Sequence, residues 1–355
     1  HDDLISFSKC IFDQYPVIRK RISSKYQFIF IDEYQDTMAD VLKIFLESVM
    51  GSNTQLYLFG DRMQQIYKNY DGTFENQFEA FDTTKALLTN YRSVTDIVQL
   101  LNKIYNDSSF EQDNSSKMKL LKADFPPRVL LCNDIGASIE NVKKSDPDTL
   151  VLYLLNKERF SYIGALNLYE AFDSMEKYSF GKTNTAVNVL TTPYEDNPDP
   201  LMKLLYCIAD MAGNYKAQRH GLIIQTLKAN KSLFCKDGWF IKSHSDREKL
   251  FCNLNKIFSV FEDETKTVAD LLSVLSTTSI IDSTYIEGIG TNGENQNVFC
   301  VPAIEVIRVI EYLNNPKVST QHGVKGESHN SVVFVADDSF RNPIVHMYRF
   351  FEMWS

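Results

Sequence analysis

Two kinds of hydrophobic pattern alternate along the first third of the chain. Two short runs are apolar and rich in aromatic and β-branched residues, which is typical of buried strands: residues 25–31 and 55–59. Three longer segments instead repeat apolar residues at the spacing of a helix face: residues 3–13, 38–45 and 93–104. Strands that alternate with helices in this way predict an α/β fold with a mostly parallel sheet.

Candidate capping residues precede two of these helices. Thr37 and Ser93 each stand before a helical segment, and an aspartate follows each of them three residues later. Hydroxyl side chains at such positions accept hydrogen bonds from the first free amide groups of a helix. We therefore expect Thr37 and Ser93 to cap the helices that follow them.

The rest of the chain continues with short strands and then becomes mainly helical. Further apolar runs predict strands at residues 129–132, 149–155 and 332–335. Residues 200–300 show mostly helical spacing. Polar stretches at residues 106–117 and 191–200 are candidate domain boundaries.

Composition narrows the class of protein. A chain of 355 residues is long for one core, so two or three domains are expected. No apolar run approaches the ~20 residues of a membrane span, and the six cysteines form no C-x-x-C pair, as in a cytosolic protein with reduced thiols. The net charge of -9 argues against a protein that coats nucleic acid by bulk charge, but it leaves room for a local basic groove.

Adjacent carboxylates at the end of the first predicted strand suggest a nucleotide site. Asp32 and Glu33 follow residues 25–31 directly. Asp32 could hold a magnesium ion, which prefers hard oxygen ligands, and Glu33 could polarise an attacking water molecule. The alternative is an acidic loop that the dipole of the next helix stabilises.

Residues 32–37, Asp-Glu-Tyr-Gln-Asp-Thr, resemble the Walker B segment of the UvrD/Rep/PcrA branch of superfamily 1 helicases. Members of that branch hydrolyse ATP and move along single-stranded DNA. Residues 60–67 are similar to the family's G-D-x-x-Q-S-I-Y motif, with Gln65 in place of its serine. The resemblance implies that Gln64 contacts the γ-phosphate region and couples it to DNA.

The same segment supplies two candidate DNA contacts, Tyr67 and Tyr70. The family continues with W-R-G-A, whose tryptophan stacks on a base, whereas this chain continues with Lys-Asn-Tyr-Asp-Gly. Tyr70 could replace the tryptophan, because any aromatic face can hold a base, although it stands one position out of register. The alternative is an ordinary core or surface tyrosine.

Residues 90–93, Asn-Tyr-Arg-Ser, are similar to the family's N-Y-R-S motif. In the family, an arginine at this place neutralises charge on the transferred phosphoryl group, so the resemblance makes Arg92 the candidate for that role. The alternative is a solvated arginine beside a helix cap, and both descriptions can hold together.

Residues 320–327 resemble motif V, T-x-H-x-x-K-G-x-E, which touches both DNA and nucleotide in the family. The glutamate here directly follows the glycine, as in a K-G-E-[ST]-H variant of the motif. The resemblance implies that Lys325 and Glu327 lie at the nucleotide, with Glu327 near the ribose. Thr320 and His322 would face DNA or the cleft between domains.

Two glycine-containing segments imitate nucleotide-binding motifs. Residues 288–293 spell G-x-G-x-x-G but follow no convincing strand, so we expect a flexible loop there. Residues 181–183 imitate the end of a phosphate-binding loop, but Glu176 stands where the required glycine should be. We therefore expect the chain to be a truncated piece of a longer protein, without the phosphate-binding loop and the last helicase motif, and to have little or no ATPase activity alone.

The resemblance implies RecA-like motor cores with a largely helical insertion. The expected divisions are the C-terminal part of a first core, the first part of a second core, a helical accessory insertion and the continuation of the second core: residues 1–99, 100–195, 196–300 and 301–355. Such a protein would be a cytoplasmic helicase or translocase that uses ATP and Mg²⁺ to move on single-stranded DNA, in the 3′ to 5′ sense that the family implies. Its partners would be single-stranded DNA, duplex junctions and a candidate nuclease or repair protein.

Two other functions fit the same motifs. One is an ATPase subunit of a nuclease or anti-phage defence complex, which a nuclease partner or domain would reveal. The other is a degenerate helicase that serves as a nucleic-acid-binding scaffold. Asp32, Glu33, Gln64 and Arg92 are all present, which argues against decay.

Overall fold

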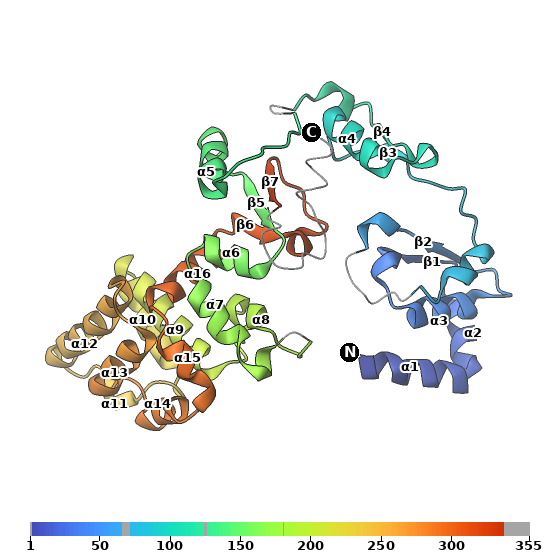
Figure 1. The fold of residues 1–355 in the computed structure, drawn as a ribbon. Coiled ribbons are helices and arrows are strands. Elements are labelled where there is room, and N and C mark those ends of the chain that lie inside the picture. The colour runs from blue at the N-terminus through green and yellow to red at the C-terminus, as the bar shows by residue number, and fades with distance from the viewer. Residues whose placement is uncertain (1, 66–71, 124–125, 180, 337–355) are drawn as a thin grey trace. The chain divides into compact units, whose positions relative to one another are not determined.

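The computed structural model describes residues 2–65, 72–123, 126–179 and 181–336 (Figure 1). These residues divide into two compact units, His1–Arg128 and Val129–Ser355.

The first unit is built around a pair of parallel strands. β1 and β2 pair from Phe28 opposite Gln55 to Ile31 opposite Leu58. Ile31 and Leu58 pack with the buried side chains of Ala39, Leu42 and Phe74. The elements of this part are α1 (Asp2–Gln14), α2 (Pro16–Lys25), β1 (Phe28–Ile31), η1 (Tyr34–Asp36), α3 (Ala39–Val49), β2 (Gln55–Leu58), η2 (Arg62–Gln64) and η3 (Glu75–Ala80).

The side chains on the other face of this strand pair are aromatic and partly exposed. Strand residues alternate between the two faces of a sheet, so the side chains that do not face the core lie together. Their rings contact one another, with centroids 5.1 Å apart for Phe30 and Tyr57 and 5.9 Å apart for Phe30 and Phe59. The members of this aromatic face, with their exposed fractions, are Phe28 (53%), Phe30 (63%), Tyr57 (40%) and Phe59 (37%).

The first unit continues with a second small parallel ladder. Thr89 pairs with Asp113, and Asn90 pairs with Asn114. The elements here are β3 (Thr89–Asn90), α4 (Thr95–Tyr105), η4 (Ser108–Phe110), β4 (Asp113–Asn114) and η5 (Met118–Leu120).

The second unit contains a parallel sheet in the order β6-β5-β7. Its core joins Val151 and Tyr153 of β5 to Val318 of β6, Val335 of β7 and Ile139 of a neighbouring helix. The elements are α5 (Ile135–Ser145), β5 (Leu150–Tyr153), β6 (Val318–Thr320), η8 (Gln321–Val324) and β7 (Val332–Val335).

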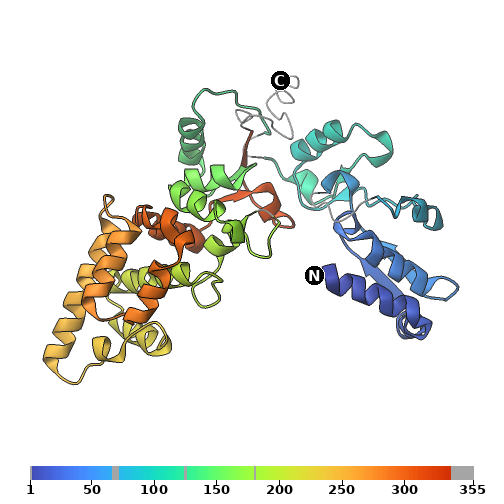
Figure 2. The same cartoon turned by 60° about the horizontal axis from the view of Figure 1, so that its bottom comes forward.

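A helical region lies in the sequence between β5 and β6 and holds the largest hydrophobic core (Figures 1 and 2). Its elements are α6 (Asn156–Tyr162), α7 (Leu166–Asp173), η6 (Glu176–Tyr178), α8 (Ala186–Thr191), α9 (Pro200–Lys216), α10 (His220–Ala229), α11 (Lys236–Trp239), α12 (His244–Glu262), α13 (Val268–Thr278), α14 (Ser283–Gly290), η7 (Gly293–Asn295), α15 (Gln296–Phe299) and α16 (Ile304–Asn314).

Local side-chain caps explain where several of these helices begin. Asp199 is 1% exposed, and its Oδ1 accepts from the amides of Leu201 and Met202 at 3.0 Å each at the start of α9. Ser243 and Thr267 each form a reciprocal capping box at the start of α12 and α13. These caps satisfy amide groups that have no partner within the helix.

Most of the predicted elements are confirmed. The strands predicted within residues 25–31, 55–59, 149–155 and 332–335 are β1, β2, β5 and β7. The predicted burial of the first two is wrong, because alternate side chains of β1 and β2 are exposed. The helices predicted from residues 3, 38 and 93 onward are α1, α3 and α4, and the mainly helical character of residues 200–300 is confirmed as well.

The two predicted caps are wrong. α3 begins after Met38 and α4 begins after Val94, and neither N-cap residue makes a side-chain capping hydrogen bond. The Thr37 hydroxyl lies 3.4 Å from the carbonyl oxygen of Glu33, to which it donates, so it serves the preceding turn. The amide of Ser93 donates to the side chain of Asn90 at 2.8 Å, so a neighbouring asparagine organises that turn.

Two further predictions are also wrong. Residues 129–132 form no strand, and Leu130 and Leu131 are more than half exposed, because this segment joins the two units and pairs with no described strand. The expected flexible loop over residues 288–293 is instead the end of α14 followed by η7. Its glycines therefore belong to a helix end, not to a phosphate-binding turn.

The described residues form a mixed fold, with many helices and small parallel sheets. The RecA-like character of the cores and the four expected divisions stay predictions. Within the described ranges, no helix has both the length and the apolar character that crossing a membrane requires.

Candidate functional site

The candidate catalytic residues of the first unit lie at one edge of its strand pair. Asp32 and Glu33 follow β1, and Gly60 and Asp61 follow β2 shortly afterwards. Because the strands run parallel, their carboxyl ends meet at the same edge, where ligands of such sheets usually bind. The pairing continues past the strands, since the Tyr34 amide donates to the Phe59 carbonyl oxygen at 3.0 Å.

Glu33 has an unusual backbone conformation. Its φ is +52° and its ψ is +45°, in the left-handed region that non-glycine residues rarely adopt. This residue turns the chain sharply from β1 into η1, while its amide donates to Oδ1 of Asp32 at 3.0 Å. Strained backbone of this kind is concentrated at functional sites, and here it leaves both carboxylate side chains exposed at the sheet edge.

Gln35 joins the two motifs, although its sequence context did not single it out. Its side chain is 1% exposed. Its Nε2 donates to a carboxylate oxygen of Glu33 at 2.5 Å, and its Oε1 accepts from the amide of Asp61 at 3.1 Å. The amide side chain therefore fixes the position of Glu33 relative to the loop after β2. The only sequence signal was its place two residues after Glu33 in a motif of polar residues.

Gly60 is required because the turn after β1 packs against it. A methyl group at Gly60 would clash with Oε1 of Gln35 and would lie 2.7 Å from Cδ1 of Tyr34. We predict that Gly60→Ala destabilises the first unit by about 1–3 kcal/mol, the usual cost of overpacking. Urea unfolding would measure the loss.

Gln35, whose side chain would clash with the added methyl group, provides the control for Gly60→Ala. In a Gln35→Ala background one of the two clashing groups is absent, so the added methyl group should cost less there. An unchanged unfolding midpoint for Gly60→Ala alone would contradict the packing described above.

Asp61 gathers three donors around one carboxylate. Its Oδ1 accepts from the amide of Met63 at 2.9 Å, and its Oδ2 accepts from Nε2 of Gln64 at 2.8 Å and from the hydroxyl of Tyr105. Burial, followed by the hydrogen bond to Asp61, raises the pKa of Tyr105 to about 12, so this tyrosine stays protonated and donates. The side chain of Gln64 is exposed and oriented by this carboxylate.

Arg92 stands in a turn that Asn90 holds. Oδ1 of Asn90 accepts from the amides of Arg92 and Ser93, at 3.0 and 2.8 Å. Asn114 reaches the same turn from β4, since its Nδ2 donates to the Ser93 carbonyl oxygen at 2.6 Å. The backbone at Arg92 is thus fixed by two asparagines, while its side chain is exposed.

The candidate residues of the second unit lie at and after the end of β6. Thr320 is 7% exposed, so its side chain is packed within this unit. The next turn is closely packed at its glycine, because a methyl group on Gly323 would lie 2.6 Å from Oγ of Ser319. Lys325 is half-buried. Glu327 is exposed, and its Oε2 lies 2.8 Å from Nε2 of His329.

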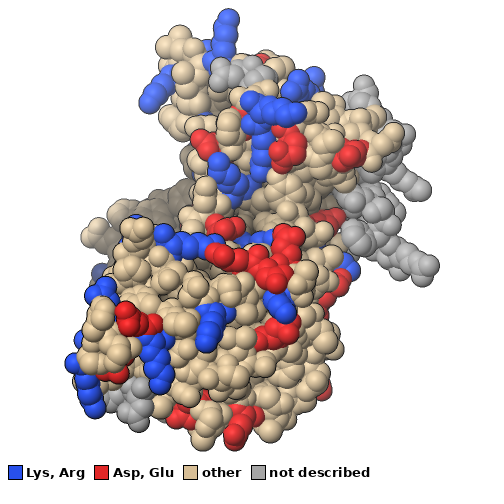
Figure 3. Space-filling view, turned by 90° about the vertical axis from the view of Figure 1, so that its left-hand side faces the viewer, with Lys and Arg blue, Asp and Glu red and all other residues tan. Residues whose placement is uncertain are grey.

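Three predicted DNA-contacting side chains cannot be placed. Tyr67 and Tyr70 lie outside the described residues, and for His322 the description covers only the backbone, within η8. Figure 3 shows basic side chains interspersed with acidic ones on the face that it presents. The charges on that face therefore do not indicate where a DNA strand would bind.

The donor set of the first unit fits a magnesium ion with bound phosphates. The exposed carboxylate of Asp32 is a hard oxygen ligand of the kind that Mg²⁺ prefers, and a magnesium ion usually completes its coordination with substrate phosphates. Gln64 adds an amide at the same edge of the strand pair. When bound, a magnesium nucleotide would supply the phosphoryl group, while Asp32 would hold the ion and Glu33 would orient the attacking water.

Comparisons with known proteins show what the chain is similar to. Residues 1–85 match the family described as the UvrD/REP helicase N-terminal domain. Over 99% of its length, the chain is 26% identical to the Gabija protein GajB of Bacillus cereus strain HuB5-5, of which it covers 56%. Over 44% of its length, it is 27% identical to the ATP-dependent DNA helicase PcrA of Bacillus subtilis strain 168, of which it covers 23%.

A third relative is also named as a DNA helicase. Over 28% of its length, the chain is 30% identical to DNA helicase II of Haemophilus influenzae, of which it covers 14%. The chain spans about half the length, or less, of the curated relatives that it matches. The resemblance to UvrD/Rep/PcrA-type helicases that the motifs indicated is confirmed by these matches.

Proposed function

We propose that this chain is part of an ATP-dependent DNA helicase or translocase of the UvrD type. The observation that carries the proposal is the sheet edge of the first unit, where Gln35 ties Glu33 to the loop that bears Asp61 and Gln64. Such a link between a carboxylate and an amide-bearing loop suits a site in which hydrolysis must be communicated to another part of the protein. The match of residues 1–85 to a helicase domain supports the same activity.

Each candidate residue then has a distinct role. Asp32 would hold the magnesium ion, and Glu33 would accept a proton from the attacking water as a general base. Gln64 would contact the γ-phosphate region, and Arg92 would neutralise charge on the transferred phosphoryl group. In the second unit, Lys325 and Glu327 are proposed nucleotide contacts.

Single-stranded DNA is the proposed track, with duplex junctions as the point of strand separation. Tyr67, Tyr70, Thr320 and His322 are the proposed contacts to DNA. Thr320 is the weakest of these candidates, because its side chain is buried in the second unit. The RecA-like character of the cores and the divisions at residues 1–99, 100–195, 196–300 and 301–355 belong to the same proposal.

A second candidate function is favoured by the extent of one match. The similarity to GajB runs along 99% of the chain, whereas the similarity to PcrA runs along 44%. Another relative is named as part of a larger enzyme, the RecBCD enzyme subunit RecB of Chlamydia muridarum. The chain would then act as the ATPase subunit of a nuclease or anti-phage defence complex, and co-purification of a nuclease with the protein from its native host would distinguish this role.

The proposed function is tested on the longer protein that contains this chain. Single-stranded DNA should stimulate its ATP hydrolysis, and it should displace a strand from a tailed duplex. If the intact protein is inert with both DNA and RNA, the motor function fails, and the scaffold hypothesis takes its place.

The 355-residue chain alone should turn over ATP poorly. Its sequence has no phosphate-binding loop, whose backbone amides and lysine anchor the β- and γ-phosphates in motors of this class. We expect phosphate release at the level of a buffer blank, with and without single-stranded DNA. Magnesium-dependent turnover by the pure chain at the rate of the longer protein would contradict this expectation.

A further inference from the structure

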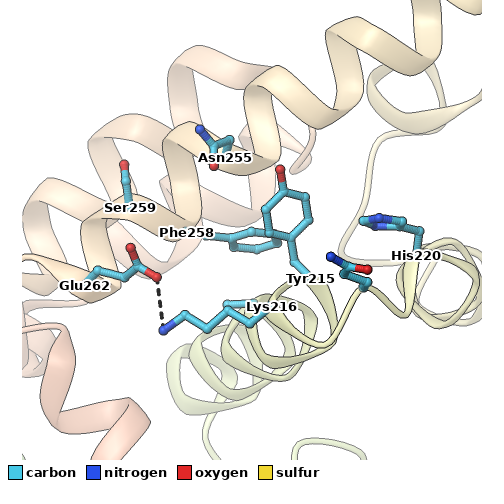
Figure 4. Close-up of a pocket in the computed structure, with 9 residues that line it drawn as sticks. Tyr215, Lys216, His220, Asn255, Phe258, Ser259 and Glu262 are labelled. Atoms are coloured by element: carbon cyan, nitrogen blue, oxygen red, sulfur yellow. Dashed lines mark ion pairs between the residues drawn. The ribbon is translucent and has the colours of Figure 1, made fainter.

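The helical region of the second unit contains a hollow between α9, the start of α10 and α12. Its volume is about 420 Å³, within the range of small-molecule pockets. In Figure 4, Tyr215 points from α9 toward α12, and Asn255, Ser259 and Glu262 follow one another along α12. None of the residues that line this hollow belongs to the helicase-like motifs.

The base of the hollow is aromatic. Phe258 is buried, and its ring centroid lies 5.3 Å from that of the half-buried Tyr215. His220 meets Tyr215 edge-on at 5.7 Å. A planar ring can stack on a partly accessible aromatic face, and such stacking tolerates different bases because every base has a π-face.

The rim of the hollow offers hydrogen-bonding groups that have no partner within the described part of the chain. The side-chain amides of Gln218 and Asn255 each carry donors and an acceptor, and neither is hydrogen-bonded to another described residue. Nδ1 of His220 is buried and also lacks a described partner. Mixed donors and acceptors of this kind match the edge of a nucleobase, which presents both.

Gln218 occupies a position where glycine is usual. Its φ is +57°, and it follows the end of α9 in the left-handed conformation that closes many helices. A glycine would adopt this conformation without strain, whereas glutamine does so at an energetic cost. A ligand that binds the side-chain amide at the rim would explain why glutamine is present here despite this energetic cost.

The charges around the hollow cancel. Nζ of Lys216 lies 3.0 Å from a carboxylate oxygen of Glu262, and Figure 4 shows this ion pair at one side. The lining contains one lysine and one glutamate, whose formal charges cancel. Such a lining favours an uncharged planar ring over a polyphosphate or a carboxylate.

We propose that this hollow binds a nucleobase, stacked on the ring of Tyr215 and hydrogen-bonded by the amides of Gln218 and Asn255. The base can belong to a free nucleotide or to single-stranded nucleic acid, because the two share this chemistry. The proposal does not depend on ATP hydrolysis. Base binding can therefore fail while the proposed motor function holds, and the motor function can fail while base binding holds.

The test uses the full 355-residue chain and adenosine as the probe. Saturation transfer from the protein to the base protons of adenosine reports binding, and a titration gives the affinity. Tyr215→Leu should weaken binding by roughly five- to a hundred-fold, the range expected for one lost stacking partner. Gln225→Ala is the matched control, since Gln225 is an exposed amide on α10 outside the hollow, and it should leave the affinity unchanged.

A second variant separates binding from folding. Gln218→Gly removes the amide but relieves the left-handed strain, so the melting temperature should stay the same or rise. Binding of adenosine should nevertheless weaken by roughly two- to ten-fold, the usual contribution of one hydrogen bond. If neither Tyr215→Leu nor Gln218→Gly changes the affinity, or if adenosine receives no saturation, the proposal is wrong.

The source of the base is distinguished by competition. Light-activated 8-azidoadenosine should label peptides from α9 or α12, and label elsewhere would overturn the proposal. A nucleic-acid strand is the source if an oligomer of deoxyadenosine displaces the label far better than adenosine does. In that case the abasic oligomer of the same length should not displace the label. Equal displacement by adenosine monophosphate and the oligomer identifies a free nucleotide, and displacement by the abasic oligomer alone contradicts base binding.

Discussion

In the longer protein, Glu33→Gln is expected to lower DNA-stimulated ATP turnover by about 10²–10⁴-fold, the usual contribution of a general base. The amide of glutamine cannot accept a proton from the attacking water, whereas its carbonyl oxygen can still accept the hydrogen bond that Gln35 now donates to Glu33. The local structure should therefore persist while the chemistry is lost. Phosphate release at saturating ATP and single-stranded DNA measures the effect.

A matched control for this change is available in the same unit. Glu79 is an exposed glutamate on η3 that contributes to neither motif, and Glu79→Gln should leave turnover unchanged. Unaltered binding of a nucleotide analogue by Glu33→Gln would show that the site is intact. Turnover of Glu33→Gln within two-fold of the parent value would remove Glu33 from the mechanism.

The second large effect is expected for Arg92→Ala. Arginines that stabilise the transferred phosphoryl group contribute about 10³–10⁵-fold to turnover, so a loss of that order is expected in the longer protein. The turn itself should survive, because Asn90 and Asn114 hold it through backbone atoms of Arg92 and Ser93. Single-turnover hydrolysis measures the chemical step, and nucleotide affinity should change much less.

Two variants make the interpretation of Arg92 specific. Arg92→Lys keeps the charge but not the planar fork, so it should recover only part of the activity. Arg21→Ala removes an exposed arginine on α2 and should have no effect on turnover. An equal loss in both alanine variants would point to general electrostatics, and an unaffected Arg92→Ala would show that another cation serves the transition state.

The sequence predicted the two strands of the first unit, because apolar runs rich in aromatic and β-branched residues favour strands. It did not predict that one face of the pair is exposed. Residues 129–132 are also four apolar residues in succession, yet they form no strand. A strand needs a partner at the right place, and local composition carries no information on partners. That is why the two runs could not be told apart from the sequence.

The site was predicted in its exposed residues and missed in its supporting ones. Asp32, Glu33 and Gln64 were selected because motifs preserve their spacing. Gln35 and Tyr105 were missed, because their importance comes from contacts across 26 and 44 residues of sequence, with the Asp61 amide and carboxylate. The caps at Thr37 and Ser93 failed for a related reason, since the left-handed turn at Glu33 and the side chain of Asn90 redirect the hydrogen bonds.

The aromatic face of β1 and β2 has a practical consequence for the chain in solution. Four contacting rings that are each more than a third exposed form the kind of apolar patch that promotes self-association. Within the described ranges no third strand joins β1 and β2, and unpaired strand edges can pair with another copy. Preparations of the chain by itself should therefore be prone to aggregate as the concentration rises, and a protein or segment that covers the face would act as a solubilising partner.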